Sequence, residues 1–193
     1  MKKMNVKAFV SIGMLSSIAY ILMLLNFPLP PFPNYLMIDF SDIPALIGAL
    51  IFGPVAGILV ELFKNLLDYF MTGSATGVPV GHIANFAAGI LFILPTYYLH
   101  KKLKTRKGMS LSLVIGTLLM AISMSVLNYF IILPAYTFFL HAPAMSAHEA
   151  RKLVVAAILP FNLVKGLLMS AIFMLLFVKM QTWIEKQTAI NEI

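Results

Sequence analysis

Two stretches of this chain hold long runs of apolar side chains with almost no charge. Residues 109–133 carry no charged side chain, and residues 153–178 carry only Lys165. A helix needs about 20 mostly apolar residues to cross the hydrocarbon core of a bilayer. Because 61% of the 193 residues are hydrophobic and only 11% are charged, the chain has the composition of an integral membrane protein.

We predict an all-α fold of six transmembrane helices in a single membrane domain, residues 1–193. The expected spans are residues 8–25, 43–52, 55–71, 82–98, 109–133 and 153–178. The second span is short because Gly53-Pro54 interrupts it, so we expect a short or tilted helix followed by a tight turn. The fifth span is expected to end at Pro134, with an external loop from there to Lys152.

The basic residues predict the orientation of these helices. Lys2, Lys3 and Lys7 precede the first span, and five basic residues fall within residues 101–107. Since basic flanks stay in the cytoplasm, both termini are predicted to be cytoplasmic and the chain to lie in the cell membrane. The same distribution explains the net charge of +7 without nucleic acid as a partner.

The first predicted external loop, residues 26–42, contains four prolines and no basic residue. Such a segment is extended and stiff. Its apolar end, residues 35–40, includes Asp39 and Phe40 and is predicted to fold back over a binding site as a lid. The alternative is an ordinary exposed connector.

A stripe of polar residues lies on one helical face of the third span: Glu61, Lys64, Asn65 and Asp68. These positions are three or four residues apart, so the side chains can pair with one another. We expect Glu61 to reach Lys64 or Asn65, and Lys64 to reach Asp68. The stripe then lines the bundle interior or a wet cavity; direct ligand contact is the alternative.

Lys165 is the most informative single residue. A lysine at the middle of a spanning helix costs on the order of 3 kcal/mol, so it is expected to face a protein interior or a ligand. Asn162 lies on the same helical face, and together the amide and the ammonium can bind a flat molecule with polar edges. The alternatives are that Lys165 extends to the membrane interface or neutralises a carboxylate.

On this topology, several polar side chains fall in the outer half to the middle of their spans, which implies a pocket open to the outside. They are Asp68, Asn85, Asn128, Asn162 and Lys165. With Tyr129 and loop aromatics in its wall, the pocket suits an aromatic, hydrogen-bonding small molecule better than a bare ion. We assign as substrate-binding residues Asn128, Asn162, Lys165, Tyr129, Asp39, Phe40 and Asn85.

The remaining sequence features concern contacts with other helices or subunits and the kinds of site that the sequence lacks. Gly13 and Ser17 form a strip of small side chains on the first span, for contact with another helix of this chain or with a partner subunit. The sequence contains no phosphate-binding loop and no cysteine, and its four histidines lack metal-ligand spacing. We therefore predict no metal, no cofactor and no ATPase within this chain.

The chain also resembles a known family: the riboflavin-specific substrate-binding (S) components of energy-coupling factor (ECF) vitamin transporters. The combination of LNY followed by LPAY with LPFNxxKG is specific to that branch. The matching stretches are residues 24–47, 53–65, 77–96, 127–140 and 159–166.

This resemblance implies six helices, a capping first loop, no catalysis and riboflavin as the transported ligand. It implies that Asn128, Asn162 and Lys165 hydrogen-bond the isoalloxazine and ribityl groups. It also implies a partner module of one membrane coupling (T) protein and two ATPases, with Gly13 and Ser17 at the contact.

Two other functions remain as alternatives. A cation-coupled carrier would use Glu61, Lys64 and Asp68, but no charges continue from them toward the cytoplasmic side. An intramembrane enzyme would use Glu61, Asp68 or His82, but no catalytic motif accompanies these residues.

Overall fold

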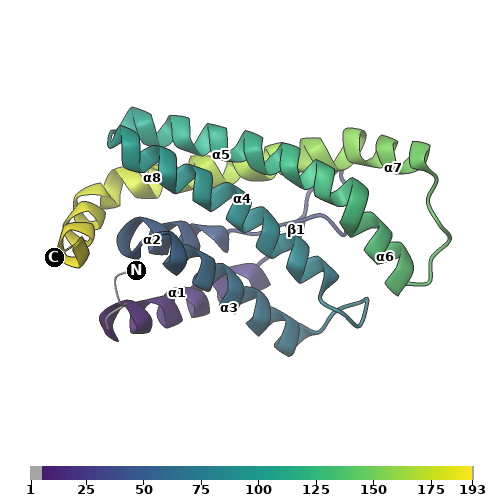
Figure 1. Ribbon diagram of the computed structural model, residues 1–193, viewed down its shortest axis with the longest axis horizontal. Helices are drawn as coiled ribbons and strands as arrows, with labels where there is room; N and C mark the ends of the chain where they lie inside the picture. The colour runs from purple at the N-terminus through teal and green to yellow at the C-terminus, as the bar shows by residue number, and fades with distance from the viewer. Residues whose placement is uncertain (1–5, 193) are drawn as a thin grey trace.

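The computed structural model describes residues 6–192, with side chains described to residue 189. Lys2 and Lys3, part of the evidence for a cytoplasmic N-terminus, lie outside the described residues. Within the described residues the fold is a bundle of helices with one two-stranded sheet (Figure 1). The elements are α1 (Val6–Leu24), β1 (Phe27–Pro28), β2 (Met37–Ile38), α2 (Asp42–Phe52), α3 (Pro54–Thr72), α4 (Val80–Leu103), α5 (Arg106–Leu127), η1 (Asn128–Ile132), α6 (Leu133–Phe139), α7 (Ala147–Leu153), η2 (Val154–Ile158) and α8 (Leu159–Glu192).

Four helical stretches are long and apolar enough to cross a membrane: Val6–Leu24, Val80–Leu103, Arg106–Phe139 and Ala147–Ala189. Two shorter or more polar helices complete the bundle. Helix α2 has only 11 residues, and α3 has 19 but carries three charged side chains. The predicted succession of six helices therefore appears in the described residues, with the second one short as expected.

The turn between α2 and α3 follows from its two residues. Gly53 has a φ of +94°, a conformation that favours glycine, and Pro54 opens α3 at a position where its missing N–H costs nothing. The two helices then pack closely where Gly57 faces Ala49. A Cβ atom at Gly57 would lie only 2.8 Å from the Cβ of Ala49, so a larger residue does not fit there without a shift. Most of α2 is consequently buried in the core against α1, α3 and α8.

The predicted end of the fifth span at Pro134 is wrong. The helix passes from α5 through the π-helical turn η1 into α6 and ends at Phe139. A proline interrupts an α-helix because it lacks an N–H donor and its ring crowds the preceding turn. The wider π-turn, which ends two residues before Pro134, accommodates that change.

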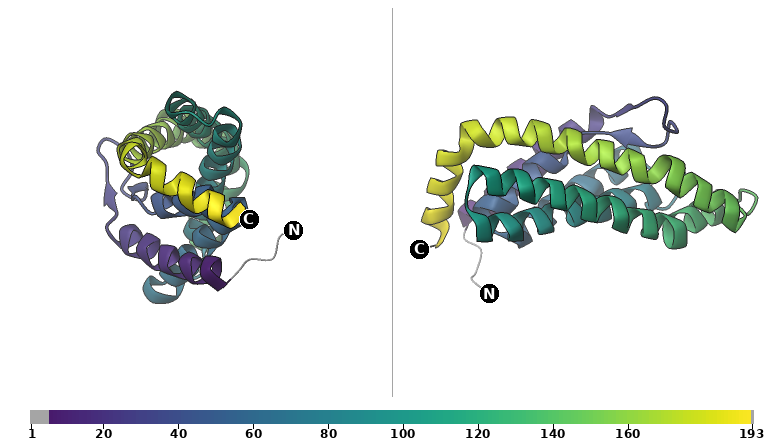
Figure 2. Two further views of the ribbon diagram at one scale, coloured as in Figure 1. Left: turned by 90° about the vertical axis from the view of Figure 1, so that its left-hand side faces the viewer. Right: turned by 90° about the horizontal axis from the view of Figure 1, so that it is seen from above.

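The last helix is also longer than predicted. It begins with α7 at Ala147 and passes through a second π-turn, η2, just before Pro160. A capping box starts it: the Ser146 hydroxyl accepts from the Glu149 N–H, and the Glu149 carboxylate accepts from the Ser146 N–H. Past Val178 the helix continues, and Figure 2 shows its C-terminal turns bending across the end of the bundle.

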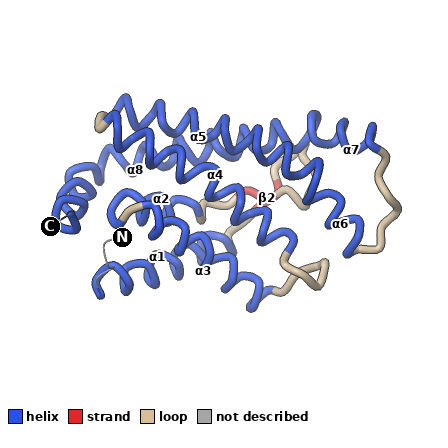
Figure 3. The backbone as a smooth tube through the Cα atoms, viewed as in Figure 1, coloured by secondary structure: helices blue, strands red, loops and turns tan. Residues whose placement is uncertain are grey.

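The first loop is partly ordered as a hairpin. β1 and β2 pair antiparallel, with Phe27 opposite Ile38 and Pro28 opposite Met37. Figure 3 shows these strands at mid-length of the bundle, and the α3–α4 and α6–α7 loops at the end opposite the C-terminus. The start of α1 lies with the C-terminal turns, since the Lys7 ammonium donates to Gln187 Oε1 at 2.9 Å.

Candidate functional site

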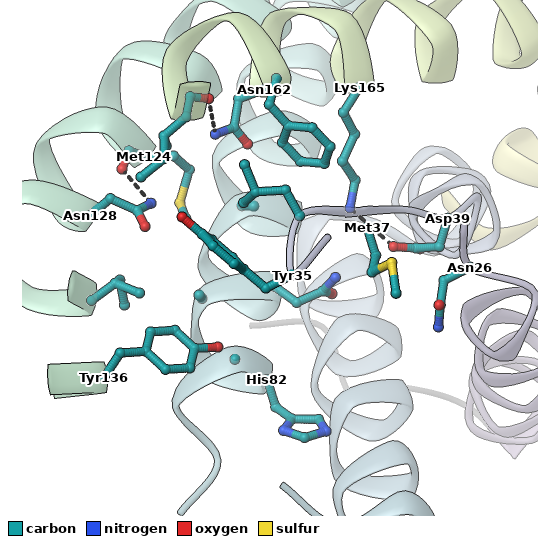
Figure 4. Close-up of a pocket in the computed structure, with 18 of the residues that line it drawn as sticks. Asn26, Tyr35, Met37, Asp39, His82, Met124, Asn128, Tyr136, Asn162 and Lys165 are labelled. Carbon is teal, nitrogen blue, oxygen red and sulfur yellow. Dashed lines mark hydrogen bonds and ion pairs between the residues drawn. The ribbon is translucent and has the colours of Figure 1, made fainter. Parts of the chain in front are cut away.

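A cavity of about 290 Å³ lies between the first loop and helices α3, α4, α5 and α8 (Figure 4). Its wall combines apolar side chains with polar ones from six different elements or loops. The polar residues are Asn26, Tyr35, Asp39, Asp68, His82, Asn85, Asn128, Tyr136, Asn162 and Lys165. The size and mixed lining are those of a small-molecule site.

Two amides form one wall of this cavity. Asn128 Nδ2 donates to the Met124 carbonyl oxygen and Asn162 Nδ2 to that of Ile158, each at 2.8 Å (Figure 4). These bonds to the preceding helical turn fix both side chains. Each amide retains its Oδ1 and a second N–H, so both can still accept from and donate to a ligand.

Each of these amides lies beside a π-turn. Asn128 is the first residue of η1, and Asn162 follows η2 by one helical turn. A π-turn inserts an extra residue and changes the direction of the side chains that follow, and such turns are frequent at functional sites. The second π-turn therefore affects the direction of Asn162, whereas Asn128 opens the first π-turn.

Lys165 is paired with a carboxylate of the first loop. Its Nζ lies 3.1 Å from Asp39 Oδ2, and both side chains are buried. Asp39 Oδ1 accepts from the N–H of Ser41 at 3.0 Å and also from the Ser41 hydroxyl. This pairing matches the expected alternative that Lys165 neutralises a carboxylate, yet both residues also line the cavity.

The polar stripe on α3 is paired differently from the prediction. Lys64 is completely buried and contacts Asp42 of α2 and, at 2.9 Å, Glu61. The expected pair of Lys64 with Asp68 is wrong, because Asp68 instead lies 3.0 Å from His82 Nε2 on α4. The stripe thus divides into a buried ion cluster below the loop and a His–Asp pair in the cavity wall.

The buried cluster is connected to the loop. Lys64 Nζ donates to the Ser41 hydroxyl oxygen at 2.7 Å, and Ser41 in turn donates to Asp39. A buried charge needs such partners to offset the loss of hydration. Ion pairs and hydrogen bonds therefore join α3, the end of the loop and Lys165 of α8.

Two of the predicted site residues lie outside the cavity. Tyr129 borders a separate groove formed with α6 and α7, and its ring contacts Phe130. Phe40 is packed against the hydrophobic core, with its ring centroid 6.3 Å from that of Phe27. We correct their predicted position accordingly, whereas Asn85, Asn128, Asn162, Asp39 and Lys165 all line the cavity.

Sequence reasoning missed several lining residues. Tyr35 projects across the middle of the cavity in Figure 4, and burial raises the pKa of its hydroxyl, which favours the neutral donor form. Met23, Asn26 and Tyr136 were also not assigned. The apolar end of the first loop was the available signal for Tyr35, but no periodicity relates a loop residue to a particular cavity.

The small residues of α1 lie on its outer face. No heavy atom outside the neighbouring helical backbone lies within 4 Å of a Cβ built at Gly13, and Ser17 is exposed, with its hydroxyl donating to the Gly13 carbonyl at 3.1 Å. Of the two expectations for this strip, contact inside the chain is not found among the described residues. Residues 6–189 also contain no group of three His, Asp or Glu side chains that could hold a metal ion.

The fold and the cavity are those of a helical membrane protein with a binding site for a small polar-edged molecule. The chain belongs to the family described as "ECF transporter, substrate-specific component", which matches residues 7–177. Members of this family are components of transporters, and the chain is accordingly a transporter component and not an enzyme.

Relatives cover nearly the whole chain. The riboflavin transporter FmnP of Bacillus subtilis (strain 168) is 58% identical over 95% of this chain and 97% of its own length. The riboflavin transporter RibU of Staphylococcus aureus (strain TCH60) is 40% identical over 96% and 97%. A solved structure of the S component of a bacterial ECF transporter superposes with a TM-score of 0.78 at 40% identity, covering 92% of this chain and 96% of that one.

Proposed function

We propose that this chain is a riboflavin-binding S component that captures riboflavin outside the cell and delivers it inward with an ATP-driven energy-coupling module. The observation that carries the proposal is the cavity in which Asn128, Asn162 and Lys165 converge under the first loop. The names of the relatives point to the same ligand.

The donors and acceptors of the cavity suit the isoalloxazine ring. Its polar edge offers carbonyl oxygens, an acceptor nitrogen and one N–H. Lys165 supplies donors only, while each asparagine supplies donors and an acceptor. Apolar side chains such as Met23, Leu36 and Phe161 line the rest of the cavity and suit the flat ring faces. Binding itself requires no metal or other cofactor.

The partners follow from the family and from the chain itself. We propose a membrane coupling (T) protein and two ATPase subunits, because the sequence contains no phosphate-binding loop. The exposed strip of Gly13 and Ser17 on α1 is the proposed contact with the coupling protein.

We further propose that the chain lies in the bacterial plasma membrane with both termini in the cytoplasm. The basic residues 101–107 support this orientation. In that orientation the first loop faces outward and acts as the lid of the cavity.

A cation-coupled secondary carrier is the less favoured alternative. Lys64, the central charge that such a carrier would use, is already held by Asp42, Glu61 and Ser41. Its pairing supports a structural role.

Equilibrium titration of the purified chain tests the proposal. Without ATP, riboflavin fluorescence should be quenched in a saturable manner, whereas thiamine should not compete. Absence of saturable binding to well-folded protein would refute the proposal. Concentrative uptake by the chain alone in liposomes would contradict the need for a coupling module.

A further inference from the structure

The cavity has a second polar wall, on the side opposite Asn128, Asn162 and Lys165. It is formed by α3, α4 and α6, and Figure 4 shows His82 and Tyr136 on this side, away from the two asparagines and Lys165. Asn85 lies one helical turn after His82 on the same face of α4. The contacts that the resemblance implies, from Asn128, Asn162 and Lys165 to the isoalloxazine and ribityl groups, do not involve this wall.

Two polar atoms of this wall lack a hydrogen-bond partner among the described residues. They are His82 Nδ1 and Asn85 Oδ1, and both are buried. A buried polar atom without a partner costs about 1 to 3 kcal/mol. Since both residues line the cavity, a bound molecule is well placed to provide the missing partners.

The His82–Asp68 pair determines the chemistry of the first atom. His82 Nε2 lies 3.0 Å from Asp68 Oδ2, and the carboxylate favours a proton on that nitrogen. In the tautomer that carries its proton on Nε2, His82 presents Nδ1 as an acceptor. Asn85 Oδ1 is also an acceptor, so this wall presents two unfilled acceptors about one turn apart.

Acceptors of this kind do not match the polar edge of a flavin ring, which is itself mainly an acceptor. They match a chain of hydroxyl groups, because each hydroxyl donates one hydrogen bond and accepts others. Tyr136 adds a hydroxyl of its own: its oxygen would lie 2.7 Å from a Cβ built at Gly81, directly before His82.

We propose that His82 and Asn85 bind the hydroxyl groups of the ligand's sugar-alcohol (polyol) chain, with Asp68 as a positioning residue for His82. This inference rests on the proposed function and divides the cavity into two subsites. The wall of Asn128, Asn162 and Lys165 holds the ring. The second wall, defined by Asp68 of α3, His82 and Asn85 of α4 and Tyr136 of α6, distinguishes a flavin with a polyol chain from one without it.

The test compares riboflavin with lumiflavin, which keeps the ring and carries a methyl group in place of the polyol chain. Wild-type protein should bind lumiflavin more weakly. His82→Phe and Asn85→Leu should each weaken riboflavin binding by about tenfold and leave lumiflavin binding within about twofold. Fluorescence quenching gives all the dissociation constants in one detergent.

The chain provides matched controls. His100 of α4 also has a buried, unpartnered Nδ1, and Asn65 of α3 has a buried, unpartnered Oδ1, yet neither lines the cavity. His100→Phe and Asn65→Leu should leave the ratio of the two flavin affinities unchanged. Asp68→Asn should weaken riboflavin binding less than His82→Phe, since it disturbs only the orientation of the imidazole.

Each outcome is informative. Equal loss of both flavins in His82→Phe and Asn85→Leu would overturn the subsite, as would unchanged riboflavin binding. If His82→Phe does not fold, His82→Gln retains an acceptor and should preserve more riboflavin affinity than His82→Ala; equal losses would overturn the proposal. Failure of the wild type to bind either flavin would instead refute the proposed function.

Discussion

Lys165 and Asp39 are 126 residues apart in the chain, and their charged groups lie 3.1 Å apart in the wall of the cavity. One belongs to α8 and the other to the first loop, directly after β2. The pair therefore ties the first loop to α8, which carries Asn162 and Lys165, two of the three proposed ring-binding residues. A ligand that accepts hydrogen bonds from Lys165 changes the same interaction that holds the loop.

Lys165→Met should weaken riboflavin binding by about tenfold or more. The change removes donors from the ligand and also leaves the Asp39 carboxylate buried without its cation, which costs more than loss of a neutral hydrogen bond. Titration by flavin fluorescence measures the effect, with thermal unfolding of the same sample as a check on the fold.

The double variant Asp39→Asn with Lys165→Met separates the two causes. It removes the unpaired carboxylate, so stability should recover substantially. If Lys165 also donates to the ligand, binding should remain weak. Recovery of wild-type affinity in the double variant would show that the lysine acts only by neutralising Asp39.

The buried cluster around Lys64 should control stability more than ligand affinity. Lys64→Ala leaves Asp42 and Glu61 buried without their cation, and breaking such a pair costs about 3 to 5 kcal/mol. Glu61→Gln, which retains the shape and one acceptor, should destabilise the protein less and change the riboflavin dissociation constant by less than about threefold. A Glu61→Gln variant that unfolds normally but loses riboflavin binding would contradict this division of roles.

Most of the helices could be predicted because their signals are local. Long apolar runs predict α1, α4, α5 and α8, and Gly53-Pro54 marks the break between α2 and α3 directly. Pro134 was misleading because the π-turn before it compensates for the missing donor, and that compensation has no sequence pattern of its own.

Five of the seven predicted site residues line the cavity, but the sequence gives a geometric reason for only one pair of them. Asn162 and Lys165 share a helical face, so their convergence could be expected. The pairs Lys165–Asp39 and Asp68–His82 join different elements, and no periodicity specifies them. Tyr129 was predicted to lie in the wall together with Asn128, but adjacent helical residues point in different directions, and Tyr129 borders a separate groove.

Substitution of the small residues on α1 should separate binding from transport. Gly13→Leu and Ser17→Leu should leave riboflavin affinity within about twofold, because these positions lie outside the cavity, but should lower uptake by the complete transporter by about tenfold. Uptake by cells or by liposomes with the whole energy-coupling module measures the second quantity. Ala171→Leu, at an exposed small residue of α8, is the matched control and should affect neither.

Riboflavin should also slow hydrogen exchange in the first loop. Without ligand this loop is held by the short β1–β2 pairing, by the contact of Phe32 with Phe161 and by the ion pair of Asp39 with Lys165. Tyr35, Leu36 and Met37 line the cavity, so a bound flavin adds contacts to these residues and makes local opening of the loop less favourable.

Amide exchange measured by mass spectrometry with and without riboflavin gives the comparison. Protection should increase at least several-fold in peptides covering residues 29–38 and remain unchanged in residues 140–146, the loop between α6 and α7. Asp39→Asn should speed exchange in residues 29–38 in the absence of ligand, because the loop then loses its charged contact with α8. If saturating riboflavin leaves the exchange of residues 29–38 unchanged, the first loop does not close over the ligand, and the lid is an ordinary connector.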